Sequence, residues 1–244
     1  MTDHTELKPR CPICTNLQVT VPNDEEYIRC NRCGVVKTKY SYDSKLYRED
    51  YADNYVEYAK TIVNIPLNLF RVGLVSRWLS PEETILDIGC CIGEFVRFAE
   101  PYYRCTGFEP NPMAAAMAKE RVKSEIITKL HKGLHVNCIT MFDVFEHIED
   151  PISFLDYLYG ILEPGGILAL TTPNAGCIPN WSDDQLRGWK HYKPKEHLFL
   201  YSEEALDYIT HRAGFKLLHV GTEESDIRPG NPNGDILTYV TRKE

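Results

Sequence analysis

Four cysteines near the start of the chain have the type and spacing of metal ligands. Cys11 and Cys14 form one Cys-x-x-Cys pair, Cys30 and Cys33 form another, and 15 residues separate the two pairs. This pattern is typical of a site in which four thiolates bind one zinc ion in tetrahedral geometry. Because every ligand is a thiolate, no coordination position remains for water or substrate. We therefore expect a structural Zn²⁺.

A second group of chemically capable residues surrounds a glycine-containing turn. The segment TILDIGCCIG carries Asp87, Gly89 and Gly93 between an expected strand and its helix, and Glu109 follows Asp87 by 22 residues. Such a turn lets a ligand approach the backbone closely at the carboxyl edge of a parallel sheet. A carboxylate at the end of the next strand can accept hydrogen bonds from both hydroxyls of a ribose. Together these residues predict a site for a nucleoside-containing ligand.

Three histidines are candidates for a general base. His147 directly follows Glu146, and His191 and His197 lie in the segment WKHYKPKEHLFLYS. Imidazole can accept the proton that a hydroxyl or amine must lose when it attacks an electrophile. The alternative is that each histidine is structural, because imidazole also serves as a hydrogen-bonding spacer.

The elements that must position these residues follow a regular pattern from residue 84 onward. Apolar strands are expected at 84–89, 105–110, 125–130, 137–144, 166–173, 215–223 and 235–243, and helices at 94–102, 113–122, 151–162 and 202–214. Apolar strands that alternate with helices of about ten residues specify a parallel sheet with helices on both faces. Residues 174–200 are expected to be irregular.

The chain divides into three expected parts. Residues 1–40 form a zinc ribbon, 41–80 a Tyr-rich helical connector, and 81–244 the α/β domain. In the connector the spacing of tyrosines predicts one helical face, and a second helix is expected at 64–79. The tyrosine helix either packs on the main domain or forms an aromatic lid over a ligand. Its face is formed by Tyr47, Tyr51, Tyr55 and Tyr58.

Composition limits where the protein acts and what it binds. No apolar run approaches the roughly 20 residues that span a bilayer, and the polar start MTDHTELKPR lacks the apolar region of a signal peptide, so we expect a cytoplasmic protein with no membrane segment. Nine cysteines in a reducing compartment favour metal thiolates over disulfides.

The net charge of -8 argues against nucleic acid as a partner. Six basic residues in 29–48 form either a solvated face or a contact for an anionic substrate.

Four motifs occur in order along the α/β part: ILDIGCCIG, GFEPNP, FDVFEHIEDP and ILEPGGILALTTPN. In these motifs the chain resembles the class I S-adenosylmethionine-dependent methyltransferases over about residues 80 to 244. It is most similar to the branch that includes ubiquinone-type O-methyltransferases and sugar-modifying methyltransferases. The resemblance implies an α/β, Rossmann-like fold with a seven-stranded, mostly parallel sheet, helices on both faces and a small zinc ribbon in front.

The resemblance also implies roles for individual residues. Asp87 and Gly89 would bound the methionine end of S-adenosylmethionine, and Gly93 would let the helix begin beside it. Glu109 would hold the ribose. Four further residues complete the implied cofactor-binding set: Cys90 and Pro110 in the two turns, and Asp143 and Phe145, which would face the reacting centre.

Two departures from the family pattern are visible. The middle glycine of the first motif is Cys91, which fits the turn only if its φ is negative or the strain is tolerated. The usual acidic residue for adenine is missing, so backbone near Lys129 and Leu130 is the expected contact. A second divalent metal at Asp143, Glu146 and His147 is an open alternative, implied by the ubiquinone-type relatives.

The expected reaction is methyl transfer to a small polar acceptor, with a hydroxyl of a sugar or sugar-like metabolite as the leading choice. Similar sugar-pathway methyltransferases begin with a small cysteine-rich zinc module, which implies that the ribbon helps to shape the acceptor pocket. The alternatives are methylation of a carbon or phosphate oxygen, methylation of nucleic acid, or a non-catalytic adaptor. The sequence leaves the acceptor and the oligomeric state open.

Overall fold

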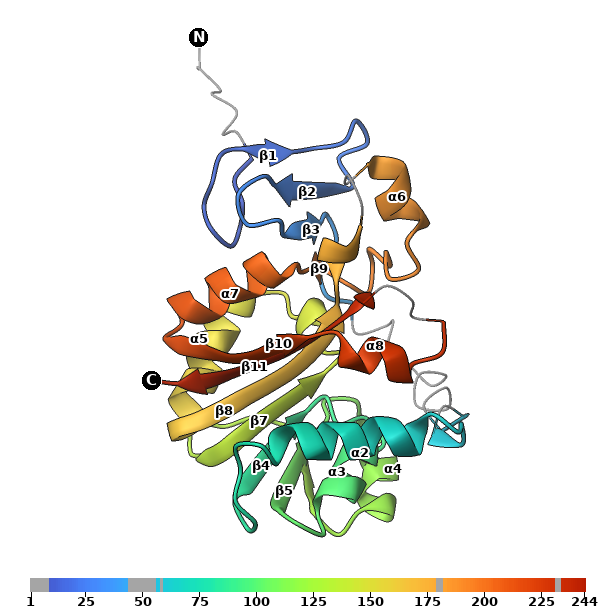
Figure 1. Cartoon of the computed structure of the whole chain (residues 1–244), viewed down its shortest axis with the longest axis vertical. Coiled ribbons are helices and arrows are strands. Elements are labelled where there is room, and N and C mark those ends of the chain that lie inside the picture. The colour runs from blue at the N-terminus through green and yellow to red at the C-terminus, as the bar shows by residue number, and fades with distance from the viewer. Residues whose placement is uncertain (1–8, 44–55, 58, 179–181, 231–233) are drawn as a thin grey trace.

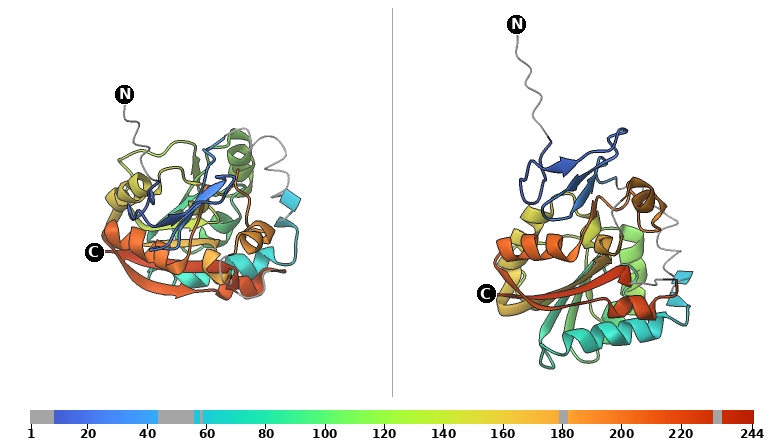
Figure 2. Two further views of the ribbon diagram at one scale, coloured as in Figure 1. Left: turned by 90° about the horizontal axis from the view of Figure 1, so that it is seen from above. Right: turned by 45° about the horizontal axis from the view of Figure 1, so that its top comes forward.

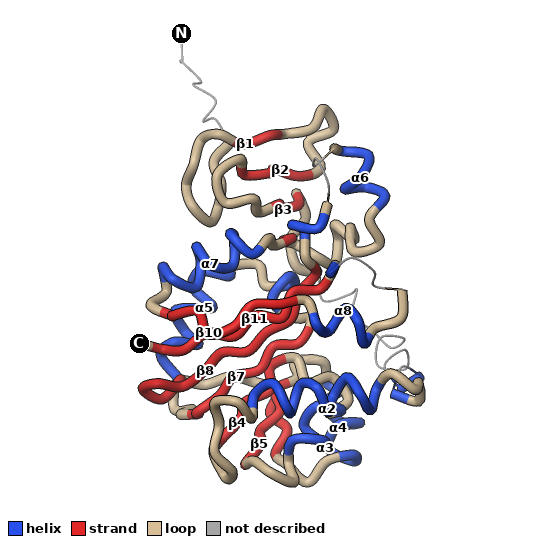
Figure 3. Tube along the Cα trace, in the orientation of Figure 1, coloured by secondary structure: helices blue, strands red, loops and turns tan. Residues whose placement is uncertain are grey.

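The computed structural model describes residues 9–43, 56–57, 59–178, 182–230 and 234–244 (Figure 1). Within these residues the chain forms a small sheet of four strands and a large sheet of seven (Figure 3). The tyrosines predicted to line one helical face, Tyr47, Tyr51, Tyr55 and Tyr58, lie outside the described residues.

Seven strands form the large sheet. They are β4 (Thr84–Ile88), β5 (Arg104–Phe108), β6 (Glu125–Ile127), β7 (Val136–Phe142), β8 (Leu162–Pro173), β10 (Phe215–Gly221) and β11 (Ile236–Lys243). They lie in the order β10-β11-β8-β7-β4-β5-β6, with β11 antiparallel to both neighbours and the other pairs parallel. The chain reverses its direction of strand addition at β4, where α/β sheets bind ligands. The predicted fold class is confirmed.

Helices cover both faces of the large sheet (Figure 1). One face carries α2 (Asn64–Val75), α3 (Glu94–Ala99) and α4 (Pro112–Arg121), and the other carries α5 (Pro151–Ile161) and α7 (Glu203–Arg212). The shorter elements are α6 (Asp183–Gly188), α8 (Glu223–Ile227), and the 3₁₀ turns η2 (Phe145–His147) and η3 (Ala175–Cys177).

Neighbouring side chains in each central strand enter different cores. In β4, Ile85 packs with the helices α2 to α4, whereas Leu86 packs with α5 and α7. In β7, Cys138 and Ile139 divide in the same way. Successive side chains of a strand point to opposite faces, so a strand buried on both faces has apolar residues at consecutive positions instead of alternating ones.

The small sheet pairs three N-terminal strands with one strand from the segment that follows β8. Its strands are β1 (Val19–Thr20), β2 (Tyr27–Cys30), β3 (Val36–Thr38) and β9 (Phe199–Leu200), each antiparallel to the next. β9 comes from the segment after β8, so the N-terminal strands complete their sheet with a strand from a distant part of the chain. Figure 2 shows the N-terminal strands at one end of the large sheet, beside α6.

Five elements differ from the expectation. Residues 174–200, expected to be irregular, contain η3, α6 and β9, and the helix α8 lies between the two closing strands. The helix expected at 64–79 is α2, which ends at Val75. No helix among the described residues has the length and apolar character needed to cross a membrane.

Candidate functional site

The turn after β4 has a left-handed backbone at three positions. Gly89, Cys91 and Gly93 have φ of 71°, 47° and 81°. A Cβ on Gly89 would lie 2.5 Å from Cγ2 of Val144, so a side chain does not fit there. The sequence allowed two conformations for Cys91, one with negative φ and one strained, and the structure shows the strained conformation with positive φ. A left-handed backbone conformation costs a non-glycine residue about 1–2 kcal/mol. Residues with such strain are found mostly at functional sites.

Glu109 connects this turn to the end of β5. Its Oε2 accepts a hydrogen bond from the Cys91 N–H at 2.9 Å, and its Oε1 accepts one from the Asn111 N–H at 2.8 Å. The carboxylate is 5% exposed, and burial raises its pKa. Each carboxylate oxygen has a second lone pair, so both can still accept a hydroxyl hydrogen. The adjacent Pro110 is exposed and precedes Asn111, the N-cap of α4.

Asp87 lies at the end of β4 with almost no contact with solvent. It is 4% exposed, and its Oδ1 accepts a hydrogen bond from Oγ1 of Thr140 at 2.7 Å. Burial raises the pKa of Asp87 to about 7. A cationic group placed beside this carboxylate would favour its ionised form.

Cys90 turns its side chain away from the turn. A Cβ on Gly107 would lie 2.7 Å from Sγ of Cys90, so the thiol packs directly over the glycine of β5. The Cys90 N–H donates to the Phe108 carbonyl at 3.0 Å. Burial raises the pKa of this thiol, as expected for a small apolar packing group. Its implied cofactor contact stays a prediction.

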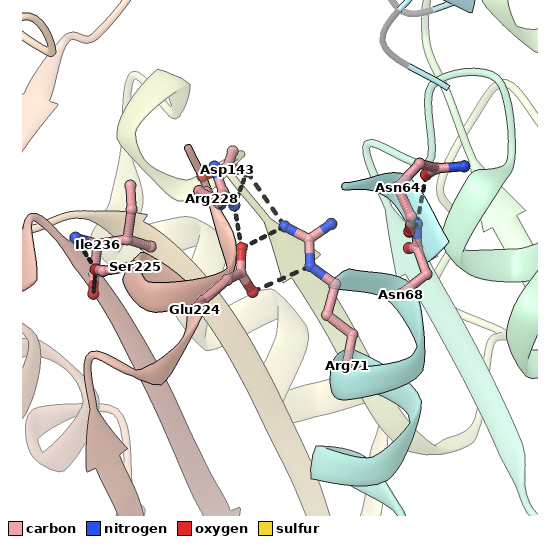
Figure 4. Close-up of polar contacts among 8 residues, drawn as sticks. All are labelled: Asn64, Asn68, Arg71, Asp143, Glu224, Ser225, Arg228 and Ile236. Carbon is pink, nitrogen blue, oxygen red and sulfur yellow. Dashed lines mark hydrogen bonds and ion pairs between the residues drawn. The ribbon is translucent and has the colours of Figure 1, made fainter. Parts of the chain in front are cut away.

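Asp143, which directly follows β7, belongs to a network of four charged side chains (Figure 4). Its Oδ2 accepts hydrogen bonds from Nη2 of Arg228 at 2.6 Å and Nη2 of Arg71 at 3.3 Å. Glu224, 0% exposed, accepts from Nε and Nη2 of Arg71 at 3.1 and 2.6 Å and also bonds Arg228. Burial alone would raise the pKa of Asp143, but the two guanidinium groups hold it below its usual range. The network fastens α2 and α8 to the end of β7.

Sequence reasoning did not find three members of this network. Glu224 and Arg228 are four residues apart, and an acid and a base at this spacing on a helix can form a pair. This spacing is the feature of the sequence that could have predicted the pair of Glu224 and Arg228. Arg71 lies 153 residues before Glu224, and its guanidinium also covers the Phe142 ring at 4.3 Å.

Phe145 and Glu146 follow in η2 and are both buried. The ring of Phe145 stacks on Tyr201 with centroids 5.0 Å apart, within the core. Its predicted position at the reacting centre stays a prediction. Glu146 is 1% exposed, and its Oε2 accepts a hydrogen bond from Oγ1 of Thr172 at 2.9 Å. Burial raises the pKa of Glu146 to about 8.

The structure brings the three predicted histidines into one neighbourhood. The rings of His147 and His197 are 5.0 Å apart, and the Nδ1 of His197 donates to the His191 carbonyl at 2.8 Å. His191 itself lies 3.5 Å from the carboxylate of Asp235. Burial lowers the pKa of His147, and it lowers that of His197 to about 3.

The ligand atoms of Glu146, His147 and His197 all lie within 4.8 Å of one another. The second divalent metal considered from the sequence would be bound by Asp143, Glu146 and His147, so that set has Asp143 where this cluster has His197. The structure instead directs the Asp143 carboxylate to Arg71 and Arg228. The predicted combination of three ligands is therefore not the combination that the described residues form.

The four N-terminal cysteines converge as their spacing predicts. Their sulfurs lie within 4.8 Å of one another, with Cys11 and Cys33 3.7 Å apart and Cys14 and Cys30 3.4 Å apart. The Cys14 and Ile13 N–H groups donate to Sγ of Cys11, each at 3.4 Å. Such donors stabilise a thiolate, and the hydrogen bond from the Cys33 thiol lowers the pKa of Cys11. The donor set and its closeness fit tetrahedral Zn²⁺.

Comparison with known proteins gives a family. A family model described as "Methyltransferase domain" matches residues 64–220, which include the turn after β4, Glu109 and η2. No curated protein sequence matches this chain.

Solved structures show the same fold at low identity. A S-adenosylmethionine-dependent methyltransferase from Clostridium acetobutylicum superposes with a TM-score of 0.61 at 12% identity, covering 80% of this chain and 99% of that chain. The plantazolicin methyltransferase BpumL, solved with a monoazolic desmethylPZN analog and SAH, gives 0.60 at 19%, covering 82% and 93%. The cyclase SpnF gives 0.53 at 17%, covering 70% and 79%. The chain belongs to the methyltransferase-domain family, and it has the fold of the class I S-adenosylmethionine-dependent methyltransferases.

Proposed function

We propose that the chain transfers the methyl group of S-adenosylmethionine to a hydroxyl of a sugar or sugar-like metabolite. The observation that carries the proposal is the buried Glu109 carboxylate, which is bonded to the N–H of Cys91 and so lies beside the turn after β4. A carboxylate at this edge of a parallel sheet is suited to two vicinal hydroxyls. The comparisons show the methyltransferase-domain family. The cofactor contacts in this chain and the acceptor are what we propose.

In the proposed complex, Glu109 accepts hydrogen bonds from the ribose and Asp87 faces the ammonium group of the methionine end. Gly89 and Gly93 give the turn its left-handed backbone beside the cofactor. Cys90, Pro110, Asp143 and Phe145 complete the predicted set, and adenine lies near the backbone of Lys129 and Leu130.

The acceptor oxygen attacks the methyl carbon in line with the sulfur–carbon bond, which breaks as S-adenosylhomocysteine leaves. The acceptor's proton must pass to a base. We assign this role to His147, which is partly exposed and four residues beyond Asp143. His197, whose pKa is about 3, is a weak base at neutral pH. We assign His197 and His191 to the support of His147.

We further propose that Cys11, Cys14, Cys30 and Cys33 hold one structural Zn²⁺ and that the ribbon shapes the acceptor side of the site. The converging sulfurs and the pairing of β3 with β9 support this assignment. The structure pairs none of the nine cysteines in a disulfide, which fits the proposed reducing, cytoplasmic location.

The test is methyl transfer from methyl-labelled S-adenosylmethionine to a panel of sugars and sugar nucleotides, with amine and carbon acceptors tested beside them. We expect labelled product from at least one hydroxyl acceptor, with a matched loss in His147→Ala. SpnF, a cyclase, shares the fold, so the fold alone does not fix the reaction. Labelled product from amine or carbon acceptors alone would replace the hydroxyl assignment.

A further inference from the structure

Two backbone carbonyls orient the imidazoles of His147 and His197. Nδ1 of His147 lies 2.7 Å from the Glu196 carbonyl, and Nδ1 of His197 lies 2.8 Å from the His191 carbonyl. A carbonyl oxygen only accepts hydrogen bonds, so each Nδ1 must carry the hydrogen. In each neutral ring the basic lone pair is then on Nε2. The tautomers of both rings are therefore set by the segment 191–198.

That segment is a compact turn with its own hydrogen bonds. The N–H of Lys193 donates to the His191 carbonyl at 2.9 Å, and the N–H groups of Glu196 and His197 donate to the Lys193 carbonyl at 2.9 and 2.8 Å. The carbonyl that orients His147 and the ring of His197 therefore lie on adjacent residues. A shift of this turn would move both imidazoles together.

The zinc ribbon fastens the turn through Thr38, the last residue of β3. The Thr38 N–H donates to the Leu198 carbonyl at 3.0 Å, which extends the pairing of β3 with β9 by one hydrogen bond. Its hydroxyl donates to the Pro194 carbonyl at 2.9 Å and lies 3.3 Å from the Leu198 carbonyl. Thr38 is 2% exposed, so these bonds do not compete with water.

We propose that Thr38 is a positioning residue: its hydroxyl holds the 194–198 turn and thereby fixes the tautomer and orientation of the His147 and His197 imidazoles. The inference rests on the proposed function, because it gives these imidazoles a role in catalysis. It assigns the ribbon a direct mechanical contact with the site through one side chain.

The two histidines report on the turn through their titration. His147 faces Glu196, Asp143 and Lys193, and His197 faces His147, Lys193 and His191. Burial favours the neutral form of both rings and holds their pKa values low. Release of the turn admits water, so both values should rise toward the ordinary 6.5.

The experiment is an NMR titration of ¹⁵N-labelled histidines in the full-length zinc-loaded chain. Thr38→Val keeps the shape and the backbone N–H but removes the hydroxyl. We expect Nδ1–H tautomers for His147 and His197 in the native chain, and in Thr38→Val a mixture of tautomers and a rise in the pKa of His197 from about 3 by at least one unit. Thr38→Ser should restore native behaviour.

The matched control is Thr20→Val, which removes an exposed ribbon hydroxyl that donates to Asn31 at 3.0 Å. It should leave both histidines unchanged. Unchanged tautomers and titration in a folded Thr38→Val chain would overturn the inference, and so would Nε2–H tautomers in the native chain even if the variant fails to fold. Binding of S-adenosylhomocysteine, measured on the same samples, separates this outcome from failure of the proposed function.

Discussion

Two buried carboxylates, Asp87 and Glu109, determine the electrostatics of the proposed cofactor site. Both have pKa values raised by burial, because the charged form of a carboxylate loses hydration inside the protein. Glu109 recovers part of this loss from two backbone N–H groups, whereas Asp87 has one hydroxyl donor. A ligand with a cation near Asp87 and hydroxyls near Glu109 would supply the missing partners of both groups.

Cofactor binding should therefore release protons. At pH 7, Asp87 with a pKa of about 7 is roughly half protonated, and an ammonium group beside it would lower that pKa. We expect a release of about half a proton per S-adenosylmethionine bound at pH 7, with affinity rising between pH 6 and 8. Calorimetry in two buffers of different ionisation enthalpy measures the release.

Asp87→Asn provides the control, because an amide has no proton to lose. It should bind more weakly and release no proton. Equal proton release by Asp87→Asn and the native chain would place the titrating group elsewhere.

At the scale of elements, the network of Arg71, Asp143, Glu224 and Arg228 holds α2 and α8 against the end of β7 (Figure 4). These elements come from three distant parts of the chain. The network contains two positive and two negative side chains, so its own charge balances. It keeps Asp143, with a left-handed φ of 58°, in place ahead of η2.

Glu224→Gln should weaken this arrangement strongly. The amide leaves two buried guanidinium groups with one carboxylate, and breaking a buried pair costs about 3–5 kcal/mol. We expect the free energy of unfolding, measured with urea, to fall by about 3 kcal/mol. The neighbouring Glu223→Gln, whose side chain is 47% exposed, should change it by less than about 1 kcal/mol. Similar losses in both variants would contradict the role of the network.

The regular elements were predictable because their signal is local. In β4, for example, the consecutive apolar residues Ile85 and Leu86 report burial on both faces, and Asp87 near its end with Gly89 after it marks a turn at the sheet edge. The short β9 was not predictable, because its pairing is decided by β3 more than 150 residues earlier in the chain. The same reason hid α8, which is held by contacts to α2 rather than by a periodic apolar face.

The residues of the candidate site also fall into those that the sequence predicts and those that it does not. Asp87, Gly89 and Glu109 could be placed from sequence because each lies at a strand end within one βαβ unit. Thr38 and Arg71 could not, because their partners lie 156 and 153 residues away in sequence. The contacts of single polar side chains across the fold leave no local pattern.

At the scale of the whole molecule, the proposed ribbon shares one core with the helices of the large sheet. A single cluster of buried residues contains all four proposed zinc ligands together with Phe199 and Tyr201 and the apolar side chains of α5 and α7. A segment of about 40 residues buries too little apolar surface to fold alone, so the proposed metal should supply much of the folding free energy of the ribbon. Loss of the metal should therefore disturb more than the ribbon.

Cys30→Ser tests this coupling. We expect loss of bound zinc and increased hydrogen exchange both in the ribbon and in residues 194–200, because β3 pairs with β9 there. Cys177→Ser, at a thiol outside the cluster of four, should keep the zinc and the native exchange. If hydrogen exchange in Cys30→Ser increases in the ribbon alone, residues 194–200 keep their structure without the ribbon and the coupling is contradicted.

The measurement that tests the central claim most directly is the affinity for S-adenosylhomocysteine of the native chain, Glu109→Ala and Glu120→Ala. Glu120 is an exposed acid on the nearby helix α4 and controls for loss of charge. We predict that Glu109→Ala raises the Kd at least about tenfold, equal to about 1.4 kcal/mol, and that Glu120→Ala leaves it unchanged. An unchanged Kd in Glu109→Ala, or no binding by the native chain, would contradict the account.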